Sequence, residues 1–236
     1  MDLVNYLIAL DRGDRTAPDK LVLPGDFVQQ LSTLYVAAET KGREHGCVLF
    51  CDRASRTFAY GDVAEGLPTS MNIPVSTHAN NLGNVHAHPS ASIGHAGGYS
   101  AHSTQDLRKF ADTKTRPYFV QFVVCGPWIY AMAQVNGVSV WDDTASGFLG
   151  KLQGFEEGEM LGAIVDAVGG EDAYLARRAP VAGDTDGLDR LLTHLKAEAH
   201  VGPLMQRLSV QSCTAFAQKY RFFFYSGEGD VLTKTA

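Results

Sequence analysis

Four histidines lie close together between Asn84 and Asp106, in the stretch NVHAHPSASIGHAGGYSAHSTQD. His86 and His88 are two residues apart, and side chains at this spacing on a β-strand point to the same side. Two imidazoles at the end of a strand could therefore bind one metal ion. A catalytic zinc ion takes three protein ligands and a water, and Asp106 is the carboxylate expected to supply the third ligand. The spacing therefore indicates a metal site.

Two further groups would complete a hydrolytic site, and each also has an ordinary structural interpretation. Ser103 and Asp106 have the spacing of a helix N-cap and its third helical residue, where a carboxylate is favoured by the helix dipole. A helix that begins there would also hold Asp106 rigidly as a ligand. Glu44, in KGREHGCVLF, lies between a predicted helix and a predicted strand and is the candidate general base. Alternatively, His-x-His is a pair of surface histidines, and Glu44 is an exposed carboxylate beside a strand.

The order of these groups resembles the JAMM motif of the MPN/JAB metalloprotease domain. That motif has a glutamate before the first strand, then His-x-His-Pro, then Ser-x-x-Asp. The resemblance covers roughly residues 25–142, including the predicted helix, hairpin, strand and helix around the motif. It implies an α/β fold with a mixed central sheet flanked by helices, similar in architecture to the cytidine deaminases. The matching residues of this chain are Glu44, His86, Ala87, His88, Pro89, Ser103 and Asp106.

The resemblance also implies a reaction and a role for each residue. His86, His88 and Asp106 would bind one Zn²⁺ ion and leave a position for water. Glu44 would take a proton from that water and pass it to the leaving amine, while the Ser103 hydroxyl would stabilise the oxyanion. The expected activity is that of a deubiquitinase-like zinc peptidase or isopeptidase. Its substrate would be a protein or peptide, and the C-terminal tail of a ubiquitin-like protein is one substrate that the family suggests.

Other classes of protein share part of this pattern. Some members of the family are scaffold or protein-binding modules that lack parts of the ligand set, so a non-catalytic module is the alternative function. A zinc deaminase would require His-x-Glu followed by Pro-Cys-x-x-Cys, and a cupin would require a glutamate soon after His-x-His; the sequence has neither. The stretch between Pro89 and Ser103 is longer than the family pattern predicts. The additional residues bring His95 and His102 into the loop at 90–102. Each of these histidines could be a flap residue, a substrate contact, a replacement ligand or a solvated loop histidine.

The hydrophobic pattern predicts the elements that would position these groups. Apolar residues from Phe27 to Ala38 have helical spacing, and this helix is predicted to stop at Gly42. A helix is predicted to begin at Ser103, and a strand before it to end at Pro89, which cannot donate a ladder hydrogen bond. The elements after the first helix are, in order, the strand GCVLF, its hairpin partner RTFAYGDVAEG, the strand LGNVHAH, the helix STQDLRKFADTK and the strands PYFVQFVVCG, WIYAMAQVNG and VSVW.

Residues 143–236 are predicted to form a mostly helical C-terminal extension that packs against the catalytic domain; alternatively, the extension is a small helical lobe that contacts a partner or a second copy of the chain. Helical spacing occurs around Ile164, more clearly from Leu188 to Leu195, and again from Pro203 to about Gln218. The stretch from Leu175 to Gly187 is predicted to be a loop, and YRFFFY is predicted to add a strand to the sheet. The predicted organisation is a lead-in at 1–24, an MPN/JAB-like metalloprotease domain at 25–142 and the extension at 143–236.

The composition is that of a globular protein and limits the expected partners. The 236 residues are 45% hydrophobic and 19% charged, with a formal net charge of −6, so the basic character of a nucleic-acid-binding protein is missing. No segment has the length and apolar character of a membrane span, so a membrane is not an expected partner either. The four cysteines form no Cys-x-x-Cys pair and are interpreted as reduced thiols. Together with the lack of a secretory signal, this predicts a cytoplasmic protein.

Overall fold

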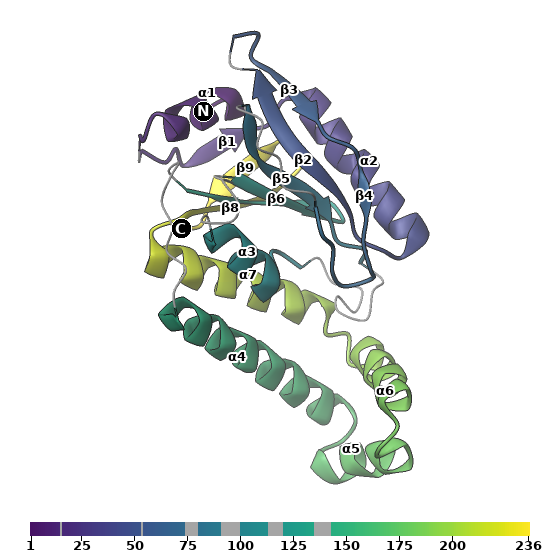
Figure 1. Ribbon diagram of the computed structural model, residues 1–236. Helices are drawn as coiled ribbons and strands as arrows, with labels where there is room; N and C mark the ends of the chain where they lie inside the picture. The colour runs from purple at the N-terminus through teal and green to yellow at the C-terminus, as the bar shows by residue number, and fades with distance from the viewer. Residues whose placement is uncertain (15, 53, 74–79, 91–99, 113–119, 135–142) are drawn as a thin grey trace.

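The computed structural model has one mixed β-sheet at its centre, with helices on both faces (Figure 1). The mixed α/β class predicted from the sequence is therefore confirmed. The predicted strand VSVW and His95 lie outside the described residues. The structure describes residues 1–14, 16–52, 54–73, 80–90, 100–112, 120–134 and 143–236.

The described residues contribute nine strands to the sheet, in the order β1-β9-β8-β7-β6-β5-β2-β3, and β4 pairs with β2. Among the described strand pairs, β5 and β6 are parallel and the others are antiparallel. The strands are β1 (Lys20–Val22), β2 (His45–Asp52), β3 (Thr57–Tyr60), β4 (Ala64–Glu65), β5 (Asn81–Ala87), β6 (Val120–Cys125), β7 (Trp128–Ala133), β8 (Phe223–Glu228) and β9 (Val231–Lys234).

The helices form layers on the two faces of the sheet. One core lies between the sheet and α1 and α2, and a second lies between the opposite face and α3, α4 and α7. The helices are α1 (Leu3–Asp11), α2 (Gly25–Lys41), α3 (Thr104–Ala111), α4 (Asp143–Ala167), α5 (Glu171–Arg178), α6 (Thr185–Glu198) and α7 (Gly202–Tyr220), with a 3₁₀ turn at Ala179–Val181. No helix among the described residues is both long enough and apolar enough to cross a membrane.

The alternation of β5 decides where its histidines point. Val85 and Ala87 are buried in the core beneath α2, so His86 between them faces the α3 side of the sheet. The His88 backbone N–H donates to the Val124 carbonyl at 2.9 Å and extends the pairing with β6 by one residue. Pro89 then ends it, because proline has no N–H to donate. The sequence thus places both imidazoles at the end of a central strand.

Residues 1–24 were expected to be a lead-in, yet they contribute a buried helix and an edge strand. Leu3, Tyr6, Leu7 and Leu10 of α1 are buried in the same core as β2 and β5. β1 pairs with β9, and β9 pairs with β8. β8 also pairs with β7, so the terminal strand predicted in YRFFFY joins the sheet. All three predicted segments of the chain therefore supply strands to one sheet.

The loop predicted from Leu175 to Gly187 is wrong for most of its length. Helix α5 extends to Arg178, the 3₁₀ turn follows, and α6 begins at Thr185. Acidic residues in the first turn of α5 and arginines in its last turn suit the helix dipole. Tyr174 supplies a buried anchor. With the end of α4, α5 and α6 form a helical arm (residues 160–200) around a small core of Ile164, Tyr174, Leu195 and Val201.

Candidate metal centre

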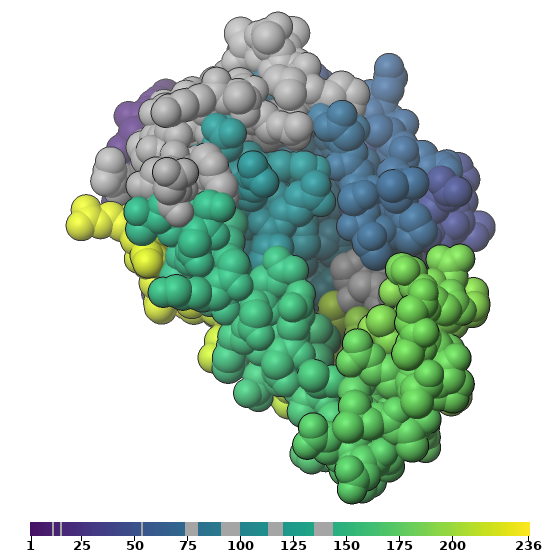
Figure 2. All heavy atoms as spheres, turned by 60° about the horizontal axis from the view of Figure 1, so that its bottom comes forward, coloured from purple at the N-terminus to yellow at the C-terminus, as the bar shows by residue number. Residues whose placement is uncertain are grey.

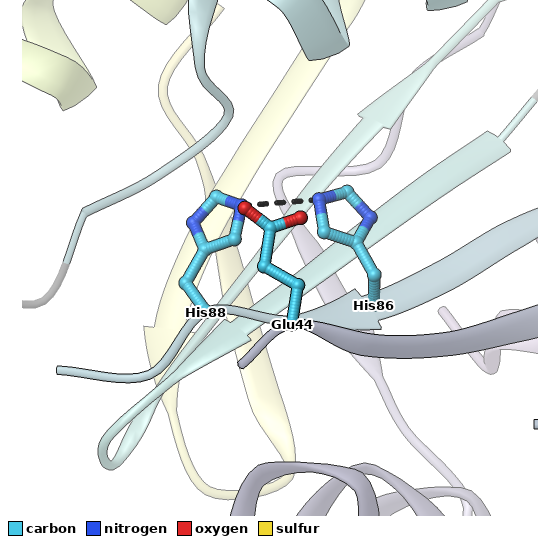
Figure 3. Close-up of side chains that lie close together, drawn as sticks. All are labelled: Glu44, His86 and His88. Atoms are coloured by element: carbon cyan, nitrogen blue, oxygen red, sulfur yellow. Dashed lines mark hydrogen bonds and ion pairs between the residues drawn. The ribbon is translucent and has the colours of Figure 1, made fainter. Parts of the chain in front are cut away.

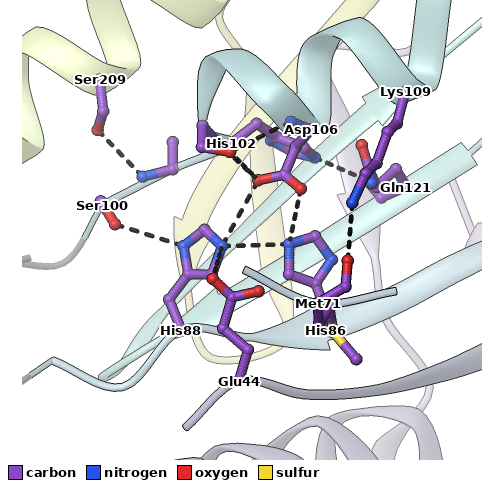
Figure 4. Close-up of polar contacts among 12 residues, drawn as sticks. Glu44, Met71, His86, His88, Ser100, His102, Asp106, Lys109, Gln121 and Ser209 are labelled. Atoms are coloured by element: carbon purple, nitrogen blue, oxygen red, sulfur yellow. Dashed lines mark hydrogen bonds and ion pairs between the residues drawn. The ribbon is translucent and has the colours of Figure 1, made fainter. Parts of the chain in front are cut away.

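Three elements meet at the end of β5 and bring the predicted site residues together. Antiparallel pairing of β2 with β5 sets Gly46 opposite His86 and His45 opposite Ala87. Glu44 precedes β2 and is consequently carried next to His88. The N-terminus of α3 packs over the same face and brings Asp106 to the imidazole pair (Figure 4). All four side chains are buried.

The nitrogen and oxygen atoms of three residues converge closely. His86 Nε2 and His88 Nε2 are 3.1 Å apart, Asp106 Oδ1 is 3.4 Å from His86 Nε2, and Asp106 Oδ2 is 3.5 Å from His88 Nε2. Ligands that bind one zinc ion tetrahedrally at 2.0–2.1 Å lie about 3.3–3.4 Å from one another. Each of these three pairs is close to that separation, and each imidazole faces a different oxygen of the Asp106 carboxylate.

Glu44 approaches the same imidazole pair from the side opposite Asp106 (Figures 3 and 4). Its Oε1 lies 4.0 Å from His88 Nε2. Ligand atoms of Glu44, His86 and His88 all lie within 4.8 Å of one another, and this buried group could bind a metal ion. Two carboxylates thus flank one pair of imidazoles, and Asp106 makes the shorter contacts.

The position of Asp106 follows from the way α3 begins. Ser103 is the N-cap, and its Oγ accepts a hydrogen bond from the Asp106 N–H at 3.1 Å. In return, Asp106 Oδ2 accepts from the Ser103 N–H at 2.9 Å and from its hydroxyl at 2.7 Å. The predicted N-cap is confirmed, and this capping box fixes Asp106 with Oδ1 toward His86. The Ser103 hydroxyl proton is directed at Asp106, so its role at an oxyanion stays a prediction.

Neighbouring residues hold the two histidines in place. Ser100 Oγ lies 3.4 Å from His88 Nδ1, which leaves Nε2 directed at Asp106. Gly46 lies opposite His86, where a Cβ would be only 2.7 Å from the His86 Cβ. Partners of this kind around a ligating histidine fix its ring orientation. The imidazole pair is therefore positioned by packing as well as by strand alternation.

The two carboxylates have opposite electrostatic environments. Burial alone would raise the pKa of Asp106, but the imidazoles of His86 and His88 hold it well below its usual range. Burial also raises the pKa of Glu44, and for this residue the same imidazoles offset the effect only in part. Burial would lower the pKa of His88, yet Asp106 and Glu44 raise it overall. Asp106 is consequently the firmly ionised member of the pair and Glu44 the more basic one.

His102 is a buried structural residue, so its interpretation as a solvated loop histidine is wrong. Its Nε2 donates to the Gln121 carbonyl at 3.2 Å, and burial lowers the pKa of His102 to about 3. Its Nδ1 has no hydrogen-bond partner among the described residues. The His102 carbonyl accepts a hydrogen bond from the Cys213 thiol of α7 at 3.5 Å. His102 therefore joins the loop before α3 to the sheet and to α7 as a neutral imidazole.

The centre opens into a cleft of about 230 Å³ between the sheet and the C-terminal helices. Glu44, His88 and Ser103 line one side, and residues of α4 and α7 line the other. Figure 2 shows the surface hollowed between the blue-green α4 and the brighter green α6. No part in the site is predicted for α4 and α7 from the sequence. Nothing in their residue spacing indicates one, because only the tertiary fold brings them opposite His88.

Neither protein-family models, nor curated proteins, nor solved structures match this chain.

Proposed function

We propose that this chain is a zinc-dependent peptidase or isopeptidase with an MPN/JAB-like fold. In this proposal His86, His88 and Asp106 bind the metal, and Glu44 is the general base. The observation that carries it is the buried convergence of two imidazoles and one carboxylate, with a second carboxylate on their other side, at the edge of a cleft.

The environments of the two carboxylates support this division of roles. An ionised carboxylate is needed as a ligand, and the low pKa of Asp106 suits it to that role. A base works best when its pKa is near the working pH, and burial moves the pKa of Glu44 in that direction. Pairs of titratable groups whose environments separate their pKa values are typical of acid–base assignments.

The chain's own residues then account for the movement of the proton. Zinc, when bound, supplies Lewis acidity that acidifies a water and polarises a carbonyl group. Glu44 accepts a proton from the attacking water at a carboxylate oxygen and delivers it to the amine nitrogen as the C–N bond breaks. Water is thereby divided between a new carboxyl group and a released amine. The bond is a peptide or an isopeptide bond in a protein or peptide, with the tail of a ubiquitin-like protein as one candidate.

One observation favours a second function. Glu44 lies within 4.8 Å of both imidazoles in the buried group, so Glu44 could itself replace Asp106 as the third ligand. Asp106 would then be the carboxylate left beside the metal, and its low pKa and its hydrogen bonds from Ser103 make it a poor base. The chain would be a non-catalytic scaffold or protein-binding module stabilised by an ion.

Metal analysis of purified variants separates the two functions. We expect about one zinc per chain in the wild type and its loss in His88→Ala and Asp106→Asn. Glu44→Gln should keep the metal and lose cleavage of peptide and isopeptide substrates. Metal lost in Glu44→Gln but kept in Asp106→Asn would favour the scaffold instead. His194→Ala is the matched control, because this imidazole is 73% exposed on α6, and it should keep the metal.

A further inference from the structure

The C-terminal helices form the wall of the cleft that faces the metal centre. α4 contributes Gln153, Glu156 and Met160, and α7 contributes Met205 and Leu208. Of the described residues that line the cleft, none is lysine or arginine. A substrate whose reacting bond lies beside His88 would have to lie against this wall, so the wall's chemistry should select the substrate.

Glu156 is the distinctive charged residue of the wall. It is half-buried and forms no ion pair with a described residue. Burial raises its pKa, and the neighbouring Ser212 hydroxyl of α7 offsets that rise in part. Its neighbour Glu157 is engaged differently, because it accepts a hydrogen bond from Gln153 at 2.8 Å and its charge interacts with Lys196 of α6. A partly desolvated carboxylate that is paired with no cation among the described residues can gain most from a cation of a ligand.

Apolar side chains line the same cleft as this carboxylate. Met160 of α4 and Met205 and Leu208 of α7 all line it. Methionine side chains adapt their shape to the apolar groups of a bound peptide. The stem of a lysine or arginine could pack on such a surface while its charged end reaches a carboxylate.

We propose that the wall formed by α4 and α7 binds a peptide segment with a lysine or arginine side chain flanked by apolar residues, and that Glu156 determines this specificity. The inference rests on the proposed function, since it places the segment next to the bond that is cleaved. It assigns the C-terminal extension a part in substrate selection. Anionic segments are disfavoured at this wall, because they would meet Glu156 and Glu157, and no lysine or arginine is among the described residues that line the cleft.

A binding experiment tests the inference separately from catalysis. The probes are short dye-labelled peptides of alanine and leucine, in which lysine, glutamine or glutamate is placed at each position in turn. Zinc-loaded Glu44→Gln protein should bind the best lysine peptide about ten-fold or more tightly than its glutamine counterpart, measured by fluorescence anisotropy. Adding Glu156→Gln should remove this preference. Adding Glu159→Gln, an exposed residue of the same helix, should leave it intact.

Charge reversal and cleavage complete the design. Glu156→Lys should turn the preference toward glutamate peptides, which a merely structural role for Glu156 would not produce. Wild-type cleavage of the same peptides is then followed by mass spectrometry. Cleavage without a charge preference overturns the inference and leaves the proposed function standing. A lysine preference that depends on Glu156, without cleavage, overturns the peptidase and supports the inference. Failure of every peptide to bind overturns the inference.

Discussion

Glycine has opposite roles in the sheet that carries the metal centre and in α4, the helix that faces it across the cleft. In the sheet, a Cβ at Gly46 would lie 2.7 Å from the His86 Cβ, and one at Gly83 would lie 1.7 Å from the Val120 carbonyl oxygen. In α4, an added Cβ would meet no neighbouring atom within 4 Å at any of the five glycines, Gly147, Gly150, Gly154, Gly158 and Gly162.

This difference shows how closely neighbouring atoms restrict the residue type at each glycine. Glycine is required in the sheet, because neighbouring backbone and the His86 side chain occupy the space of a side chain. In an exposed helix each glycine costs about 1 kcal/mol relative to alanine, and in α4 no close packing offsets that cost. The candidate metal centre therefore lies in the part of the molecule that tolerates substitutions least. One wall of its cleft is formed by α4, which substitution of glycine could stabilise.

The largest effect should come from Gly83→Ala. The added methyl would collide with the backbone of β6 and break the parallel pairing that holds β5. We expect the free energy of unfolding to fall by about 3 kcal/mol or more, with loss of the metal because both histidines follow on β5. Urea denaturation and metal analysis measure these effects. A stable, metal-loaded Gly83→Ala protein would contradict the claim that packing in the sheet requires glycine at this position.

Gly46→Ala should disturb the imidazole pair and the neighbouring backbone together. The methyl would lie 2.7 Å from both the His86 Cβ and the Val85 carbonyl oxygen, so we expect metal affinity to fall about ten- to hundred-fold, with a loss of stability of about 1–3 kcal/mol. Gly61→Ala is the matched control, because its Cβ would come no closer than 3.5 Å to Val48. Competition with a chromogenic chelator measures the affinity. Equal affinities in the two variants would show that Gly46 does not position His86.

The parts of the site that depend on local geometry could be predicted from the sequence. Strand alternation fixes that His86 and His88 share a side, and the helix N-cap fixes how Ser103 and Asp106 interact. These relations span two or three residues, so local geometry decides them. The identity of α2 follows in the same way from its apolar stripe and its stop at Gly42, which adopts a φ of 62°.

The parts that depend on long-range packing could not be predicted. That Glu44 and Asp106 lie on opposite sides of the imidazole pair depends on the register of β2 against β5 and on the packing of α3 over them. The burial of His102 depends on contacts with β6 and α7. The polar sequence around His102 is typical of an exposed loop, so it does not indicate this burial. Pairing of β1 with β9 joins the two ends of the chain, and no local pattern signals such a pairing.

Lowering the pH should destabilise the folded protein through His102, which is buried against the sheet. The pKa of His102 is lowered to about 3 in the folded state, whereas the ordinary pKa of histidine is about 6.5. Between these two pH values, His102 is protonated in the unfolded state but neutral in the folded state. The stability that it contributes is present above pH 6.5 and lost as the pH falls, by about 1.4 kcal/mol per pH unit. Metal-free wild type should lose more stability than His102→Gln between pH 7 and pH 5, measured by urea denaturation.

Two neighbouring groups modify this pH dependence. The pKa of His88 is raised, so its contribution is lost as the pH rises and opposes that of His102. The low pKa of Asp106 adds a loss of stability in acid only below its ordinary value of about 3.9. Both groups are present in wild type and variant, so the difference between the two proteins reports on His102 and its interactions with these groups. Parallel pH profiles would mean that His102 is not held neutral by burial.

The smallest effect, and the one of opposite sign, should come from Gly154→Ala in α4. Because no neighbouring atom lies within 4 Å of the added Cβ, only the helix propensity changes, and we expect a gain of about 0.5–1 kcal/mol. Slower hydrogen exchange of α4 amides would locate the gain in that helix, and the metal content should stay as in the wild type. Alanine would thus stabilise α4 at a glycine and destabilise the sheet at Gly46. A loss of stability at Gly154 would instead mean that this helix face is closely covered, and the contrast between the two regions would fail.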